Sequence, residues 1–193
     1  MGLADFASRI GGVLSDPRDT FRRVAAGEGS GLEAVFLTFS FPALLGALTG
    51  SIIIGHAGGG AVLVLLTALG GAVVAAVAWV LLAGIAHLFA KYVFKGNGRF
   101  DSLLKLYGYS SSPLFLVLAG VLLASVWPAW LSLVTLTLTA IALTWVVVLY
   151  VVAVEENYGI SVGRALMSSI AAPLLLSVLL TYAILVATGA IRL

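Results

Sequence analysis

The sequence predicts an all-α, polytopic membrane protein with five transmembrane helices, preceded by short interfacial helices on the cytoplasmic side. Two observations predict this fold class. The chain is 62% hydrophobic and only 9% charged, whereas soluble domains contain about 25% charged residues. Three long stretches also lack Asp, Glu, Lys and Arg altogether: Ala34–Ala90, Leu106–Val154 and Ala165–Ile191. Because a helix needs about 20 apolar residues to cross the hydrocarbon core, these stretches predict two, two and one crossings.

The N-terminal segment, residues 1–32, is predicted to be cytoplasmic and amphipathic. Apolar residues recur at three- and four-residue spacing from Leu3 to Leu14, with charged residues between them. This pattern is typical of a helix that lies in the headgroup plane. Asp16 and Pro17 then start a second short helix, since Asp is a favoured N-cap and Pro fits the first helical turn.

Residues 33–193 form the predicted five-helix transmembrane domain. Its spans are expected at about 33–54, 61–94, 108–126, 129–153 and 163–189. At 1.5 Å per residue the second span is roughly 50 Å long, so it should tilt or project beyond the bilayer. Residues 100–107 are expected to form a short interfacial helix before the third span, and residues 155–159 to form a polar loop before the fifth.

The basic residues orient these spans. Of the ten Lys and Arg residues, all but Arg192 fall in the N-terminal segment or in the connections on the same side of the membrane. The positive-inside rule therefore predicts a cytoplasmic N-terminus and an external C-terminus.

The same distribution gives the cytoplasmic side a positive charge. A basic residue near an anionic membrane surface contributes about 1 kcal/mol of attraction. We therefore expect membrane lipids, including anionic headgroups, to be partners of a basic face. This face is formed by Arg18, Arg22, Arg23, Lys91, Lys95 and Arg99. The formal net charge of +2 is too small to suggest nucleic-acid binding.

Small residues recur at four-residue spacing on the first two spans. They are Gly46 and Gly50 on the first span, and Ala68, Ala72 and Ala76 on the second. Small residues allow membrane helices to approach closely. The pattern predicts that these spans pack as a hairpin, and a protein partner or a homo-oligomer is the alternative use of such a surface.

Three prolines lie on helices that run outward from the cytoplasm, and hydroxyl side chains cluster near each of them. Each proline frees a carbonyl group one turn earlier, which a nearby hydroxyl or water can satisfy. Two interpretations remain open: three ordinary kinks, or kinks that splay the cytoplasmic halves and open a shallow polar cavity. The residues proposed for this cavity are Pro42, Gly108, Tyr109, Ser110, Ser112, Pro113, Ser169 and Pro173.

The sequence contains no pattern of residues that indicates catalysis. It lacks cysteine, and HExxH, GxSxG and P-loop motifs are absent. His87, Glu155 and Glu156 could share the cytoplasmic face and bind a cation, but their spacing is not that of metal ligands. The two acids are instead expected to pair with Arg164 or Lys105, or to be solvated. We therefore expect no catalytic residue, no cofactor and no metal.

Two motifs in the cytoplasmic half resemble the Yip family of Ypt/Rab-interacting membrane proteins. They are Gly-Asn-Gly-Arg-Phe at residues 96–100 and Tyr-Gly-Tyr-Ser-Ser-Ser-Pro at residues 107–113. Two weaker features agree with this resemblance. Residues 16–21 are similar to the Pro-x-x-x-Phe entry segment of prokaryotic members, and residues 164–166 leading to Pro173 are similar to the start of their last span.

The resemblance implies a five-span fold and a non-enzymatic protein that organises membranes or binds partners as a scaffold. In eukaryotes the family is associated with membrane trafficking and with Rab GTPases, which it contacts largely through a long N-terminal region. Only about 32 residues precede the first span here, so Rab binding is not expected. The short form resembles a prokaryotic member in the plasma membrane. The alternative function is a small transporter, channel or lipid-handling protein that uses the proline-kinked cavity.

Overall fold

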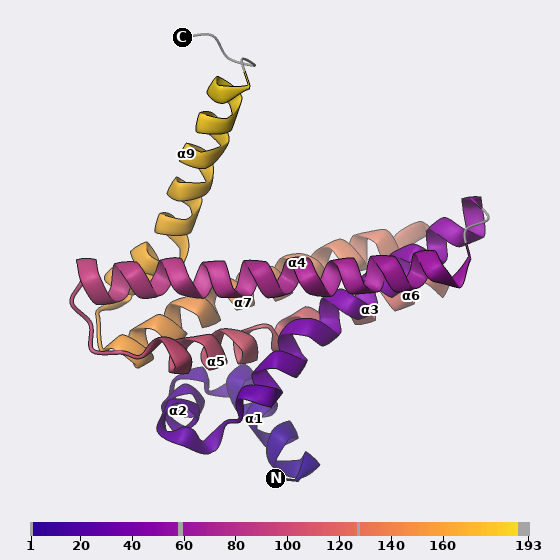
Figure 1. The fold of residues 1–193 in the computed structure, drawn as a ribbon. Helices are drawn as coiled ribbons and strands as arrows, with labels where there is room; N and C mark the ends of the chain where they lie inside the picture. Colours follow the sequence, from indigo (N-terminus) through magenta and orange to yellow (C-terminus); the bar gives the residue numbers. More distant parts are fainter. Residues whose placement is uncertain (1, 58–59, 127, 189–193) are drawn as a thin grey trace.

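The computed structural model describes residues 2–57, 60–126 and 128–188, and no strand occurs in this part of the chain (Figure 1). Arg192 lies outside the described residues. Five helices in these ranges are long and apolar enough to cross a membrane. The predicted fold class, an all-α polytopic membrane protein, is therefore confirmed.

Two short helices precede the first long one, as the amphipathic pattern predicts. Helix α1 spans Leu3–Ser15 and α2 spans Pro17–Arg23, and a π-helical turn follows at Val24–Glu28. The Asp16 side chain caps α2 by accepting a hydrogen bond from a backbone N–H in its first turn. Such a cap satisfies one of the donors that a helix start leaves free. Gly27, with φ of 116°, then turns the chain toward the next helix.

The first hairpin consists of two long helices. Helix α3 spans Gly31–Ala57 and α4 spans Ala61–Leu88, with a π-helical continuation at Phe89–Val93. These two helices share the most extensive contact between any two elements of the described chain. The extended α4 agrees with the expectation of a second span that is longer than the hydrocarbon core.

The third apolar segment is broken near its middle. Helix α5 spans Phe100–Ser110, a 3₁₀ turn covers Ser112–Leu114, and α6 spans Phe115–Val126. Pro113 lacks the N–H that an α-helix needs and clashes with the preceding turn, which explains the change to the tighter turn. The short helix expected at 100–107 is present as the first part of α5, and it packs against α3, α4 and α7.

The remaining helices differ from their expected bounds at the ends. Helix α7 spans Pro128–Tyr158 and continues beyond the expected end at residue 153, so Glu155 and Glu156 lie on a helix and not in a loop. Helix α8 spans Val162–Leu166, a π-helical turn covers Met167–Ala171, and α9 spans Ala172–Ala187.

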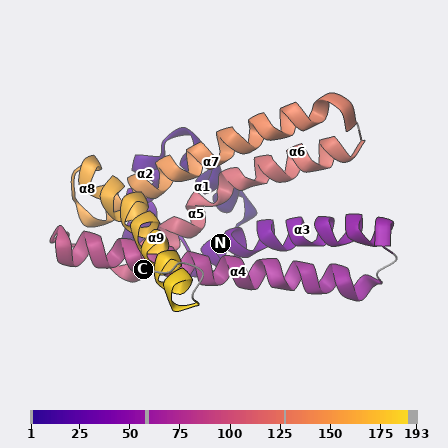
Figure 2. The same cartoon turned by 90° about the horizontal axis from the view of Figure 1, so that it is seen from above.

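The two hairpins, α3–α4 and α6–α7, come together at one end and diverge toward the other (Figure 2). We call the end where they converge the basal end. It is formed by the start of α3, the ends of α4 and α7, and α5, with α1 and α2 against it (Figures 1 and 2).

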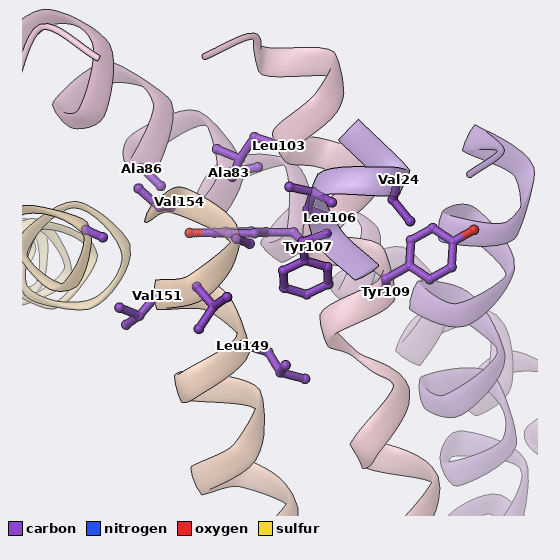
Figure 3. Packing of buried hydrophobic residues seen from close by; sticks show 14 of the residues in the cluster. Val24, Ala83, Ala86, Leu103, Leu106, Tyr107, Tyr109, Leu149, Val151 and Val154 are labelled. Carbon is purple, nitrogen blue, oxygen red and sulfur yellow. The ribbon is translucent and has the colours of Figure 1, made fainter. Parts of the chain in front are cut away.

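The hydrophobic core lies at the basal end (Figure 3). Large side chains of α5 and α7 fill it, and alanines of α4 line one side of it. Its labelled members are Val24, Ala83, Ala86, Leu103, Leu106, Tyr107, Tyr109, Leu149, Val151 and Val154. Splaying of this half of the bundle was one of the two interpretations left open for the prolines, and the packed core at this end does not support it. Small residues allow close backbone approach here, and the hairpins spread at the opposite end.

Helix α9 projects away from the other helices (Figures 1 and 2). Its described side chains from 174 to 184 are all exposed, and α9 contacts α4 and the preceding π-helical turn. An uncharged helix with apolar side chains all round suits hydrocarbon as its surroundings. Among the described residues, exposure from 174 to 184 indicates that the fifth apolar segment packs against the bundle near its start.

Candidate functional site

Helices α1 and α2, which we call the collar, are fastened to the basal end by two clusters of ion pairs. In the first cluster, Arg9 of α1 meets Glu33 at the start of α3. The distances are 2.5 Å from Arg9 Nη2 to Glu33 Oε1 and 3.1 Å from Arg9 Nε to Glu33 Oε2. The Tyr109 hydroxyl of α5 donates a hydrogen bond to the same carboxylate. One carboxylate therefore connects three helices.

This first cluster is mostly shielded from solvent, because the Arg9 and Glu33 side chains are 12% and 15% exposed. Burial opposes the charge on Arg9, but the hydrogen bonds with Glu33 and Tyr109 outweigh it and raise the pKa of the guanidinium above its usual value. The pairing is bidentate, which is the strong form of an Arg–carboxylate contact. Removing one partner would leave the other charge buried and unpaired, which is costly.

The second cluster joins α2 to the end of α7. Arg18 Nη2 lies 2.7 Å from Glu155 Oε2, and Arg22 Nε lies 2.6 Å from Glu156 Oε2. Arg18 also reaches Glu156, at 3.3 Å. The hydrogen bond to Glu156 raises the pKa of the Arg22 guanidinium. These acids were expected to pair with Arg164 or Lys105, or to be solvated, and the extra turn of α7 beside α2 explains the difference.

The remaining members of the predicted basic face divide into two groups. Arg23 pairs with Asp19 at 3.1 Å, and Arg99 pairs with Asp101 at 3.0 Å. Lys91 and Lys95 are exposed. The acids therefore neutralise much of the positive charge that the sequence shows, while all these cations keep solvent-accessible side chains.

The Gly-Asn-Gly loop packs tightly against the end of α7. A Cβ added to Gly96 would lie 2.7 Å from Tyr158 Cβ, and one added to Gly98 would lie 2.5 Å from the Asn157 carbonyl oxygen. The Asn97 N–H donates to the Tyr158 carbonyl at 3.2 Å. Real side chains avoid such short contacts, so both positions require glycine. The loop motif thus serves close packing of backbone against backbone.

The Tyr-Gly-Tyr motif of α5 occupies the centre of the core (Figure 3). Tyr107 stacks on Tyr150 with ring centroids 4.2 Å apart. Gly108, which lies between Tyr107 and Tyr109 in the sequence, faces α3, where an added Cβ would lie 2.6 Å from Ala34 Cβ. Both family-like motifs are therefore explained by packing at the basal end.

The residues proposed for a polar cavity do not gather around one space. Ser110 and Ser169 are buried, and their hydroxyls donate to the carbonyls of Leu106 and Ala165, one turn earlier on their own helices. The half-buried Pro42 lies in the α3–α4 contact, where an added Cβ on Gly71 would meet its carbonyl oxygen at 2.7 Å.

Ser112 and Pro113 line a groove between α1, α3 and α6, and the other side chains of this lining are apolar. Pro173 lies at the start of α9, on a helix that does not contribute to this groove. The hypothesis of one polar cavity shared by the three prolines is therefore not supported by the described residues.

The structure places Gly46 and Gly50 against α4. Their added Cβ atoms would lie 2.3 Å from the Thr67 carbonyl oxygen and 2.4 Å from Thr67 Oγ1, respectively. Ala68 contributes to the same close contact, while Ala72 and Ala76 are half-buried further along α4. Sequence reasoning missed Thr67, although it precedes the alanine series by one residue and could have been recognised as a small residue.

His87 lies at the basal end of α4 in an aromatic setting. Its Nδ1 atom hydrogen-bonds the Tyr158 hydroxyl, and its ring contacts Phe100 edge-on, with centroids 5.4 Å apart. Glu155 and Glu156 contact the collar arginines instead of this imidazole. Within the described residues, no group of three or more His, Cys, Asp or Glu side chains is placed to hold a metal ion.

The family model of the Yip1 domain matches residues 11–184, which is most of the chain. The chain belongs to the Yip1 domain family. Searches of curated proteins and of solved structures gave no significant match. The Yip1 domain match includes α2, the Gly-Asn-Gly loop, the Tyr-Gly-Tyr motif and most of α9, so the resemblance drawn from these motifs is confirmed.

Proposed function

We propose that this Yip1 domain protein is a non-enzymatic membrane scaffold that organises lipids or binds partner proteins at one face of the membrane. The Yip1 domain family is not known as enzymatic. In this proposal the collar and the N-terminus lie in the cytoplasm, the C-terminus lies outside, and the membrane is a prokaryotic plasma membrane. The distribution of Lys and Arg along the chain supports this orientation.

The observation that carries the proposal is the attachment of the collar to the basal end. Three charged contacts between distant parts of the chain, Arg9–Glu33, Arg18–Glu155 and Arg22–Glu156, hold α1 and α2 against the spans. A scaffold needs such a fixed platform, because ordering a loose segment at the moment of binding reduces affinity. The collar also keeps arginine side chains accessible to anionic lipid headgroups or an acidic partner.

The alternative function is a small transporter, channel or lipid-handling protein that uses a cavity between the proline-kinked helices. It receives little support, since the groove at Pro113 has an apolar lining and conduction of polar solutes needs polar groups along the path. A flux assay in reconstituted liposomes distinguishes the two functions. A solute flux above that of empty liposomes would favour the transporter.

The test of the scaffold separates basic charge from collar attachment. One variant, Arg23→Ala/Lys91→Ala/Lys95→Ala, removes cations other than the two arginines that form the ion pairs with α7. A second variant, Arg18→Ala/Arg22→Ala, detaches α2 from α7. Both are purified from native membranes, and the co-purifying lipids and proteins are identified by mass spectrometry.

We expect the first variant to lose anionic lipid and the second to lose bound protein as well. A headgroup contribution of about 1 kcal/mol per cation predicts a clear loss of anionic lipid on removal of three. If both variants retain the wild-type set of lipids and proteins, the scaffold proposal is wrong.

A further inference from the structure

A groove separates the collar from the spans on one side of the molecule. It has a volume of about 410 Å³ and lies between α1, α3 and α6. Phe6, Ile10 and Leu14 of α1 form one wall, and Phe36 of α3 and Leu116 of α6 belong to the opposite wall. The groove therefore lies where an interfacial helix meets two membrane helices.

The walls of this groove continue into the apolar surface of the spans. Phe36 is 57% exposed, and Leu14 and Leu116 are also exposed. Phe6 contacts Phe36 edge-on, with ring centroids 6.1 Å apart, so the two walls meet at this aromatic pair. An apolar molecule dissolved in the bilayer could thus enter the groove from the side without crossing water.

One polar group interrupts the apolar lining. Ser112 is 5% exposed, and its buried Oγ has no hydrogen-bond partner in the structure. The two preceding serines do have hydrogen-bond partners, because the hydroxyls of Ser110 and Ser111 donate to the carbonyls of Leu106 and Tyr107. Buried hydroxyls are normally satisfied, and a serine hydroxyl can turn between staggered rotamers without moving the backbone.

We propose that this groove binds one acyl chain of a membrane glycerolipid, with the ester carbonyl of that chain accepting a hydrogen bond from Ser112 Oγ. An acyl chain with a single ester matches a lining that is apolar except for one donor. A peptide segment fits less well, since its backbone would bring several N–H and C=O groups that the lining does not satisfy. This site is separate from the proposed scaffold function and does not depend on it.

The experiment uses the full chain in lipid nanodiscs that contain a phosphatidylglycerol with a photoreactive diazirine in one acyl chain. Crosslinked positions are mapped by mass spectrometry, and lipid retained after transfer to detergent is counted by native mass spectrometry. Leu116→Trp and, independently, Ile10→Trp fill the groove from opposite walls. Ser112→Ala removes the hydroxyl, and Leu179→Trp is the control because Leu179 is exposed on α9, away from this groove.

We expect crosslinks on the groove walls and one retained lipid in the wild-type protein. Either groove-filling variant should lower both signals at least fivefold, and Ser112→Ala should lower lipid retention about three- to tenfold, as the loss of one hydrogen bond implies. Leu179→Trp should leave both signals unchanged.

Two results would overturn the proposal. Equal labelling of α9 and the groove, insensitive to both tryptophan variants, would show that the groove is ordinary lipid-facing surface. Crosslinks from groove residues to a second protein chain would show that a protein occupies it. Thermal unfolding of each variant in detergent distinguishes loss of lipid binding from loss of the fold. Because the two groove-filling variants lie on different helices, one of them still tests the proposal if the other does not fold.

Discussion

Replacement of Gly108 by alanine should destabilise the contact between α5 and α3. The added Cβ would lie 2.6 Å from Ala34 Cβ, 2.7 Å from its carbonyl oxygen and 2.8 Å from its Cα. Carbon atoms in favourable contact are about 3.5–4.0 Å apart, so the two helices would have to separate by roughly 1 Å. Two of the three close atoms belong to the backbone of α3, which cannot rotate away.

The size of the effect follows from the cost of overpacking, which is about 1–3 kcal/mol in a well-packed core. At about 2–4 °C per kcal/mol for a protein of this size, the Gly108→Ala variant should unfold several degrees below the wild type. Thermal unfolding in detergent micelles, followed by tryptophan fluorescence, measures this shift. Trp79 is a suitable reporter because it is buried beside α5 and its Nε1 donates to the Leu104 carbonyl at 3.0 Å.

Two controls make this test specific. Gly84→Ala on α4 has nothing within 4 Å of its added Cβ, so it should be neutral or stabilising by up to about 1 kcal/mol through helix propensity. The double variant Gly108→Ala/Ala34→Gly removes the clash with Ala34 Cβ but keeps the two backbone clashes, so rescue should be partial. Equal melting temperatures of Gly108→Ala and the wild type would refute the packing argument.

Two further predictions concern the collar. Tyr109→Phe removes the hydroxyl that donates to Glu33 and should lower the free energy of unfolding by about 1.5–3 kcal/mol, as for a hydrogen bond to a charged group. Amide hydrogen exchange in α1 should then become faster. An unchanged exchange rate in α1 would contradict the role of this bond. Glu156→Gln removes the charge that faces Arg18 and Arg22 and should make α2 accessible to limited proteolysis in low salt. High salt should make α2 of the wild-type protein accessible to proteolysis too, because Arg18 is 49% exposed and exposed ion pairs are screened by salt. If α2 resists proteolysis both in the Glu156→Gln variant and in high salt, apolar contacts alone hold α2 against α7.

Much of the basal end could be anticipated from local sequence, but its contacts could not. The pattern from Leu3 to Leu14 indicated α1, and Asp16 with Pro17 indicated α2. The ion-pair partners of the charged side chains could not be predicted from local sequence. Glu155 appeared as part of a polar loop, yet an additional turn of α7 carries it to Arg18, which lies far away in the sequence.

The broken third segment shows the same limit. Pro113 indicated a kink, and the structure has a 3₁₀ turn at that point. The positions of Phe100, Leu103, Leu104 and Tyr107 predicted a short interfacial helix at residues 100–107. Burial of α5 depends on the side chains of α3, α4 and α7 that surround it, and this information is not contained in the segment itself.

The sequence by itself determined the membrane character, the number of long apolar helices and the family, because each depends on composition or motifs within one helix length. Hydrocarbon selects uncharged helices whatever the rest of the chain does. Only the tertiary structure decided which arginine meets which acid, why Gly98 and Gly108 must be glycine, and where an apolar groove opens beside Ser112. These features arise where surfaces from distant parts of the chain meet, and contact energies there depend on distances of a few ångströms.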